Sequence, residues 1–295
     1  MATRSIILNR NNIVSNTNNT VLRYNFAGTQ SFSDQEICVA SIQMYNSVFN
    51  IDTQLYNNNS FTYTFHNATG TGFDTFSVVI PDGYYSTNDL NEYFVSVMDS
   101  RGHFIQNNTT RAKTYYYTIL DNVNRYAVQL VCSKLPSTAD LTGSTRGSTT
   151  WTAPASGSAT HRTGQITFLT TNNFHLILGF AQQSYPSSPS TASSFNALSS
   201  VPPVQQPVSS ILLTCNLVEN PLSNPSNLLT SFTINQAEFG AMAIINPNNL
   251  IWQPCSHITG ASYLELRMLD QDFRPFKIQD NQMLFNILIK EKEKK

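Results

Sequence analysis

Apolar and other side chains alternate in short runs along the whole chain. The clearest run is SFTYTFH, in which Phe61, Tyr63 and Phe65 alternate with threonines. Alternation of this kind places the apolar side chains on one face of a β-strand. The same pattern predicts strands in TVLRYNF (Leu22, Tyr24, Phe26), TFSVVI (Phe76, Val78, Ile80), RYAVQLV (Tyr126, Val128, Leu130), EICVASIQMY, QITFLT, FHLILGF, SSILLTCNLV and LTSFTINQ. About ten short strands between Asn, Gly, Ser and Pro clusters predict a sandwich or barrel.

Two further patterned runs stand near the C-terminal end of the chain. We expect them to form a terminal hairpin whose apolar side chains complete the core, namely Leu264, Leu266 and Met268, then Met283, Phe285, Ile287 and Ile289. Asp270 and Asp272 lie in the connection. Alternating carboxylates can ligate calcium, but a role in the turn is the preferred interpretation.

One segment, STNDLNEYFVSVMDSRG, has the period of a helix. Ser86 can cap its first turn, with Asp89 three residues later, and Gly102 can end it. Its apolar residues recur at three- and four-residue spacing, as Leu90, Tyr93, Phe94, Val97 and Met98. The stripe predicts a short helix that packs on a sheet.

The chain contains few charged residues. Only 12% of the 295 residues are charged and the net charge is −1, so Asn, Ser and Thr provide most of the polar surface. Such a composition lacks the basic surface that nucleic-acid binding requires. It suits a protein whose flanks lie against neighbours, because each buried charge would need a partner.

Four parts of the chain lack a strand pattern. We expect 1–19 to be an N-terminal arm and 291–295 a charged tail. The domain predicted between them, 20–290, contains two segments rich in small polar residues and proline, at about 136–165 and 182–208. These are expected to be loops or a small insertion region.

The sequence predicts no catalytic residue, no cofactor site and no metal site. Its histidines, His66, His103, His161, His175 and His257, are scattered without metal-ligand spacing. The four cysteines, Cys38, Cys132, Cys215 and Cys255, lie far apart in apolar contexts and are expected to be free and buried.

The N-terminal apolar run, Ile6 to Leu8, is too short for a signal peptide, and no stretch is long enough to span a bilayer. We therefore expect synthesis in the cytosol and no membrane span.

Six motifs in order resemble the minor capsid or penton proteins of virophages and polinton-like viruses. The motifs are EICVASIQMYNSVFNI (36–51), IPDGYYSTNDLNEYFVSVM (80–98), LGF (178–180), ILLTCNLVEN (211–220), FGAMAIINPNN (239–249) and YLELRMLDQDFRPFKIQDNQMLFNILIK (263–290). The resemblance implies an all-β fold, a single jelly-roll β-sandwich with one short helix and inserted loops. It also implies a non-enzymatic virion protein that forms homopentamers at the capsid vertices, beside trimers of a double-jelly-roll major capsid protein.

Two other functions remain open at this point. Trp151, in a loop of small residues, motivates a receptor- or carbohydrate-binding sandwich, although a tryptophan in a loop is more often a packing anchor. A polysaccharide hydrolase would need two carboxylates that face a cleft, and no such pair is evident.

Overall fold

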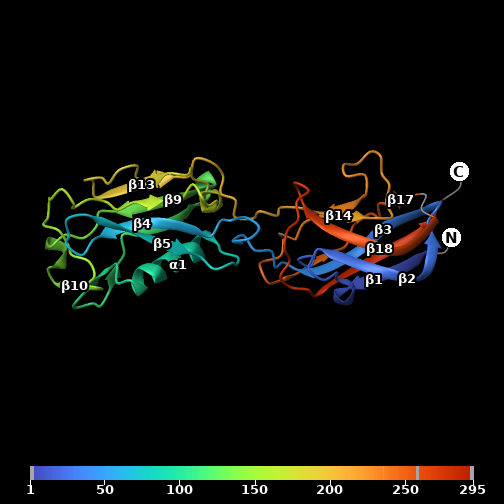
Figure 1. Cartoon of the computed structure of the whole chain (residues 1–295), viewed down its shortest axis with the longest axis horizontal. Coiled ribbons are helices and arrows are strands. Elements are labelled where there is room, and N and C mark those ends of the chain that lie inside the picture. The colour runs from blue at the N-terminus through green and yellow to red at the C-terminus, as the bar shows by residue number, and fades with distance from the viewer. Residues whose placement is uncertain (1–2, 235, 257–258, 293–295) are drawn as a thin grey trace. The chain divides into compact units, whose positions relative to one another are not determined.

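The chain forms two compact units in the computed structural model, which describes residues 3–234, 236–256 and 259–292. Unit 1 comprises Met1–Phe49 and Gln206–Lys295, and unit 2 comprises Asn50–Gln205 (Figure 1). Unit 2 is therefore inserted into the chain of unit 1. Its sheets, like those of unit 1, are antiparallel.

Unit 1 is a sandwich of two sheets. Its strands are β1 (Arg4–Asn9), β2 (Val21–Ser31), β3 (Gln35–Tyr45), β14 (Ile211–Cys215), β15 (Leu228–Phe232), β16 (Met242–Ile245), β17 (Gln253–Pro254), β18 (Thr259–Asp270) and β19 (Met283–Glu291), and η1 (Arg10–Asn12) is a short 3-10 helix. Sheet A has the order β1-β19-β3-β16, with β17 also paired to β3, and sheet B has the order β15-β14-β18-β2.

The strand order identifies unit 1 as a jelly roll. Leaving out the short β17, sheet A contains the first, last, third and sixth strands, and sheet B the fifth, fourth, seventh and second. Two interleaved Greek keys produce this order. The predicted fold class, a single jelly roll in an all-β protein, is thus confirmed.

The predicted terminal hairpin is wrong. β18 pairs with β2 and β14, whereas β19 pairs with β1 and β3 in the other sheet. The two strands face each other across the core, as consecutive strands do when the chain crosses from one sheet of a jelly roll to the other. The prediction that they fill the core is confirmed, since Leu264, Leu266, Phe285 and Ile287 are all 0% exposed.

The N-terminal segment differs from the predicted arm. Residues Arg4–Asn9 form β1, which pairs with β19 along its whole length. Ile6 and Leu8 point to the core side, and Leu8 is fully buried. Without β1, the apolar strand β19 would be an open edge of sheet A.

Unit 2 contains both α-helices that the structure describes. Its elements are β4 (Ser60–His66), β5 (Phe73–Val79), α1 (Thr87–Ser100), β6 (Ile105–Asn107), β7 (Lys113–Thr114), β8 (Tyr117–Asn122), η2 (Val123–Arg125), β9 (Ala127–Ser133), η3 (Ala139–Leu141), β10 (Ser144–Arg146), β11 (Ile166–Thr167), α2 (Phe174–Leu178), β12 (Ser184–Tyr185) and β13 (Ser194–Leu198). Three small sheets have the orders β12-β11-β4-β5, β13-β9-β8 and β10-β6-β7.

The insertion is larger than the sequence predicted. The jelly roll is interrupted by the whole of 50–205, whereas the predicted interruptions were 136–165 and 182–208. These two segments, apart from 206–208, belong to unit 2 and supply β10, β12 and β13. The strands of unit 2 have the same period as those of unit 1, so alternation alone did not distinguish the two cores.

Helix α1 agrees with its prediction. Ser86 accepts a hydrogen bond from the Asp89 backbone N–H, and the Asp89 carboxylate accepts one from the Ser86 N–H at 2.8 Å. Leu90, Phe94 and Met98 are buried. Gly102 follows the helix at φ +67°, where a Cβ would lie 2.6 Å from the backbone of 147, so only glycine fits there.

One strand prediction fails in unit 2, and another, RYAVQLV, is confirmed as β9 except at Tyr126. FHLILGF forms the helix α2, because Phe174, Ile177 and Leu178 share one buried helical face, and Gly179 ends it at φ +76°. Tyr126 does not share the inner face of β9; it lies in the β8–β9 connection at φ +49° and is 71% exposed.

The jelly roll should depend on its last strand. Deleting 280–295 removes β19 from between β1 and β3, so we expect insoluble chain or the loss of the cooperative thermal transition of unit 1. Deleting only 291–295 removes one register pair, Glu291↔Gln35, and the backbone bond from Lys292 to Asp34. That variant should melt within about 5 °C of the intact protein by circular dichroism. Soluble, cooperatively melting 1–279 would contradict the assigned position of β19.

The cap of α1 offers a second test. Ser86→Ala leaves an N–H of the first turn without its acceptor and should lower the unfolding free energy of unit 2 by about 1 kcal/mol, measured in urea. The control Ser96→Ala lies at an exposed position within the same helix and should be neutral or slightly stabilising. Equal effects of the two substitutions would argue against the capping role.

Candidate functional site

Most of the outer face of sheet A carries no formal charge. Its side chains alternate with buried ones on four strands, and we call the uncharged set the neutral face: Ser5, Ile7 and Asn9 on β1, Leu284, Asn286 and Leu288 on β19, Ser41, Gln43 and Tyr45 on β3, and Met242 and Ile244 on β16. Ile7 is 55% exposed, Met242 46% and Ile244 59%. Three large apolar side chains therefore point to solvent from a folded sheet.

Register places these residues side by side. Ile7 is opposite Asn286, and Ile244 is opposite Gln43. The Ser5 hydroxyl donates a hydrogen bond of 2.7 Å to the Asn286 side chain, so two polar groups of the face satisfy each other. A surface of apolar and neutral polar groups can be covered without burying an ion.

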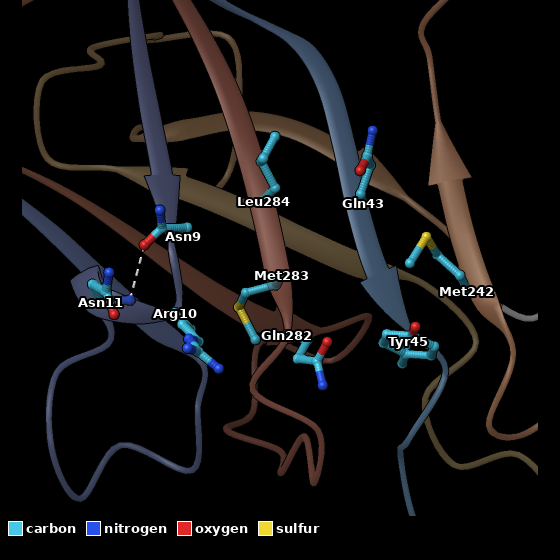
Figure 2. Close-up of a pocket in the computed structure, with 9 residues that line it drawn as sticks. All are labelled: Asn9, Arg10, Asn11, Gln43, Tyr45, Met242, Gln282, Met283 and Leu284. Carbon is cyan, nitrogen blue, oxygen red and sulfur yellow. Dashed lines mark hydrogen bonds between the residues drawn. The ribbon is translucent and has the colours of Figure 1, made fainter.

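A pocket opens at one end of the neutral face (Figure 2). It has a volume of about 300 Å³ and is formed where β1 and β3 end and β16 and β19 begin. Its lining is mainly amide and apolar: Asn9, Arg10, Asn11, Gln43, Tyr45, Met242, Gln282, Met283 and Leu284. Arg10 is its one charged lining residue.

Charges of sheet A lie at the border of the neutral face. Lys290 Nζ is 3.6 Å from the Glu36 carboxylate and 4.4 Å from the centroid of the Trp252 ring. The ammonium is thus held by an acid and an aromatic ring at the end of β19.

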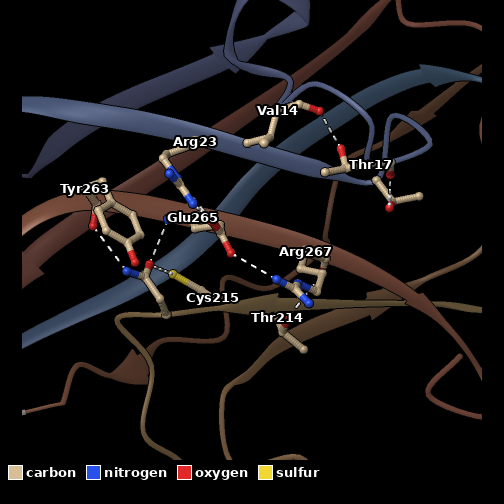
Figure 3. A network of polar contacts seen from close by, with 10 residues as sticks. Val14, Thr17, Arg23, Thr214, Cys215, Tyr263, Glu265 and Arg267 are labelled. Atoms are coloured by element: carbon tan, nitrogen blue, oxygen red, sulfur yellow. Dashed lines mark hydrogen bonds and ion pairs between the residues drawn. The ribbon is translucent and has the colours of Figure 1, made fainter. Parts of the chain in front are cut away.

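The outer face of sheet B is charged instead (Figure 3). Glu265 on β18 binds Arg23 at 2.6 Å and Arg267 at 3.3 Å, and the Arg23 guanidinium lies 4.5 Å from the centroid of the Tyr263 ring. Asn216 accepts a hydrogen bond of 2.7 Å from the Glu265 backbone N–H. The two faces of the sandwich therefore differ: one is neutral and partly apolar, and the other carries two arginines and one carboxylate.

Trp151 is a packing anchor. It is 1% exposed, its Nε1 donates a hydrogen bond of 2.8 Å to the Gly102 carbonyl, and its ring centroid lies 5.1 Å from that of Phe65. Arg146 lies over the ring at 5.7 Å. A sugar cannot reach this side chain, so the prediction of a carbohydrate site at Trp151 is wrong.

Asp270 and Asp272 have the predicted role in a turn. Asp270 accepts hydrogen bonds from the backbone N–H groups of Asp272 and Arg274, at 2.9 and 2.8 Å, and pairs with the Arg274 side chain at 3.0 Å. Asp272 also contacts that guanidinium, at 2.5 Å. Both carboxylates are engaged by Arg274, and nothing favours the calcium alternative.

The cysteines are free and buried, as predicted. Burial raises the pKa of the Cys38 thiol to about 11 and those of Cys132, Cys215 and Cys255 to about 12. Such thiols are protonated at neutral pH and unreactive.

Within the described ranges, no three His, Cys, Asp or Glu side chains are grouped so that they could hold a metal ion. His66, His103, His161 and His175 all lie in unit 2, and His257 lies outside the described residues. Among the residues that the structure describes, no helix is both long enough and apolar enough to cross a membrane.

No family model matches the sequence, and no curated protein matches it. Among solved structures, the chain is similar to the mavirus penton protein, with a TM-score of 0.41 and 9% identity over 98% of this chain and 97% of that chain. It is also similar to a chain in the cryo-EM structure of the Sputnik virophage, with a TM-score of 0.36 and 11% identity over 99% and 98% of the two chains. The assignment of a jelly roll rests on the strand order of unit 1.

Sequence reasoning missed the neutral face. Its signal was present in FGAMAIINPNNLIW (239–252), where no charged residue interrupts two exposed apolar positions of an edge strand, Met242 and Ile244. Alternation showed that a strand was present but not which of its faces is covered.

Replacing Trp151 should affect stability. We expect Trp151→Ala to lower the unfolding free energy of unit 2 by about 3–5 kcal/mol, because it removes a buried ring and its hydrogen bond, as measured by urea unfolding followed by circular dichroism. Val123→Ala, at a side chain that is 85% exposed in the same unit, should change it by less than about 0.5 kcal/mol. Unchanged stability of Trp151→Ala, together with lost glycan binding, would restore the carbohydrate hypothesis.

Proposed function

We propose that the protein is a structural capsid protein that forms pentameric vertices, or pentons, of an icosahedral double-stranded DNA virus or virophage. The observation that carries this proposal is the neutral outer face on a jelly-roll sheet. The side chains of Ile7, Met242 and Ile244 expose apolar area to water. Clustered apolar area on a folded protein is typical of a surface that binds another protein, so we expect a neighbouring subunit to cover this face.

The jelly roll itself supports a role in a shell. Viral capsid proteins use this architecture, although lectins and cupins do as well. Capsid use is favoured over sugar binding here by the burial of Trp151, and over cupin-type metal chemistry by the scattered histidines. The six motifs of the sequence, in the order found in virophage and polinton-like penton proteins, support the same role.

The proposed partners follow from this role. Copies of the chain contact one another heterologously around a five-fold axis, and such a ring closes only if five successive rotations return to the first copy. Trimers of a double-jelly-roll major capsid protein surround the ring. The protein is made in the host cytosol, resides in the virion, and has no enzymatic activity and no specific nucleic-acid ligand.

Oligomeric state tests the proposal. Purified protein should give pentamers by mass photometry, and purified particles should contain the chain. Ile244→Glu places a charge on the neutral face at a solvent-exposed position, so it should keep the thermal stability of the isolated chain and raise the pentamer dissociation constant at least tenfold.

The matched control is Ser231→Glu, at an exposed position of β15 on the charged face of sheet B. It should leave the dissociation constant unchanged. Equal weakening by both substitutions would remove the neutral face from the interface. A protein that is monomeric at every concentration and absent from purified particles would overturn the vertex role.

A further inference from the structure

Two histidines are buried together in the aromatic core of unit 2. His66 is 1% exposed and His103 is 2% exposed. Phe65 contacts both, with its ring centroid 4.4 Å from that of His103, in a stacked arrangement, and 5.9 Å from that of His66. Trp151 packs on Phe65 and on His66, at 5.1 and 6.4 Å. A change in the charge of either imidazole therefore affects the packing of the same cluster of aromatic rings.

Only one of the two ring nitrogens of His66 has a hydrogen-bond acceptor nearby in the described part of the chain. Its Nε2 is 2.9 Å from the Pro136 carbonyl oxygen, which can only accept, so Nε2 carries the proton. Its Nδ1 is buried and has no hydrogen-bond partner among the described residues. Protonation would create a buried N–H with nothing to receive it, which is costly. Burial accordingly lowers the pKa of His66 to about 4.

His103 is neutral for a different reason. Its Nδ1 is 2.7 Å from the Tyr63 hydroxyl oxygen, which also accepts a hydrogen bond of 3.4 Å from Arg101. In neutral His103 the hydroxyl can donate its proton to Nδ1 while it accepts from Arg101, so both of its contacts are satisfied. Protonation of Nδ1 would take away the acceptor of that hydroxyl proton and add a second cation beside Arg101. Burial first, and then the Arg101 charge, lowers the pKa of His103 to about 4.

In the contacts of the described residues, neither imidazole is hydrogen-bonded to a carboxylate. Arg101 lies over the Tyr63 and Phe76 rings at 5.7 and 5.6 Å, and Arg146 lies over Trp151. His161 opposes a charge on His66. The titratable or charged groups on the elements around the cluster are Tyr63 on β4, the exposed Asp74 opposite Phe65 on β5, Arg101 after α1, Tyr116 and Tyr117 at β8, Arg146 on β10, and His161 with its neighbours Lys134 and Asp140 in the connections.

The buried pair has no counterpart in unit 1, where the described residues include no histidine at all. Unit 1 is built on apolar side chains such as Leu266, Phe285 and Ile287. Mild acid should therefore act on the two units unequally.

We propose that unit 2 is an acid-sensitive switch, in which protonation of His66 and His103 opens the aromatic core around Trp151 while the jelly roll of unit 1 stays folded. Unit 2 is closed at neutral pH and exposes its aromatic side chains in mild acid. The inference goes beyond the proposed vertex role and does not rest on it, because it concerns the stability of the single chain.

The direction of the pH effect follows from linkage. Both folded pKa values are about 4, below the ordinary value of 6.5, so the unfolded state binds protons more readily. The contribution of the two neutral histidines to the free energy of unfolding of unit 2 is fully present above pH 6.5, and it decreases as the pH falls from 6.5 towards 4. With two protons taken up, the unfolding equilibrium constant should rise by up to about a hundredfold per pH unit within this window.

Tryptophan fluorescence can report on unit 2 alone. The chain has two tryptophans, and Trp252→Phe leaves Trp151, in the same ring cluster as both histidines, as the single probe. The urea midpoint of the Trp151 transition should be constant from pH 7.5 to about 6.5 and fall steeply by pH 5.0. Equal midpoints at pH 7.5 and 5.0 would overturn the proposal.

Hydrogen exchange of the unmodified full-length chain tests the inequality of the two units. After correction for intrinsic rates, peptides from β4 and β9 should lose protection between pH 7.5 and 5.0, and peptides from β18 and β19 should keep it. Loss of protection in all four strands together would contradict a switch confined to unit 2.

Non-titrating replacements identify the groups. In the double variant His66→Gln/His103→Asn, the introduced glutamine amide can still donate to the Pro136 carbonyl, and the carbonyl oxygen of the introduced asparagine can still accept from Tyr63. This variant should be less stable at pH 7.5 but lose most of the fall in midpoint between pH 7.5 and 5.0. His161→Asn, at a half-buried position, should retain most of that fall. If His161→Asn removes the fall in midpoint and the double variant does not, His66 and His103 are not the groups responsible. If the double variant does not fold, the hydrogen-exchange experiment on the unmodified chain tests the proposal instead.

Discussion

The position of β19 between β1 and β3 is the constraint on which the rest of the jelly roll depends. It ties the first strand of the chain to the last, and it supplies Phe285 and Ile287 to a core whose opposite wall contains Leu264 and Leu266. The pairings of β19 with β1 and β3 are distant in sequence. The sandwich can close only after the whole chain, including unit 2, has been made.

A large insertion is compatible with this constraint. Unit 2 enters between β3 and β14 and has its own core of strands and α1, to which unit 1 contributes no side chain among the described residues. The entropic cost of closing a loop grows slowly with its length, and a loop that is itself folded adds less than a flexible one. The two cores also differ in kind: that of unit 1 is mainly aliphatic, and that of unit 2 is rich in aromatic rings around His66, His103 and Trp151.

The low charge of the chain has different consequences in the two units. In unit 1 it leaves one face of the sandwich neutral, whereas Arg23, Glu265 and Arg267 mark the other. In unit 2 it leaves the buried histidines near Arg101 and Arg146 without a carboxylate partner in the contacts described above.

The amino-acid sequence alone determined the β-rich class, helix α1 with its Ser86 cap, the buried free cysteines and the core residues of the last two strands. These features depend on side-chain period and on neighbours a few residues away, which a linear pattern records. The same pattern wrongly predicted a strand for Phe174–Leu178, because a short apolar run suits a buried helix equally well. The division into two units, the separation of β18 from β19, the burial of Trp151 and the meeting of His66 with His103 were decided only by tertiary structure. Each depends on which strands pair across long stretches of chain, and period-two alternation is identical for every possible partner.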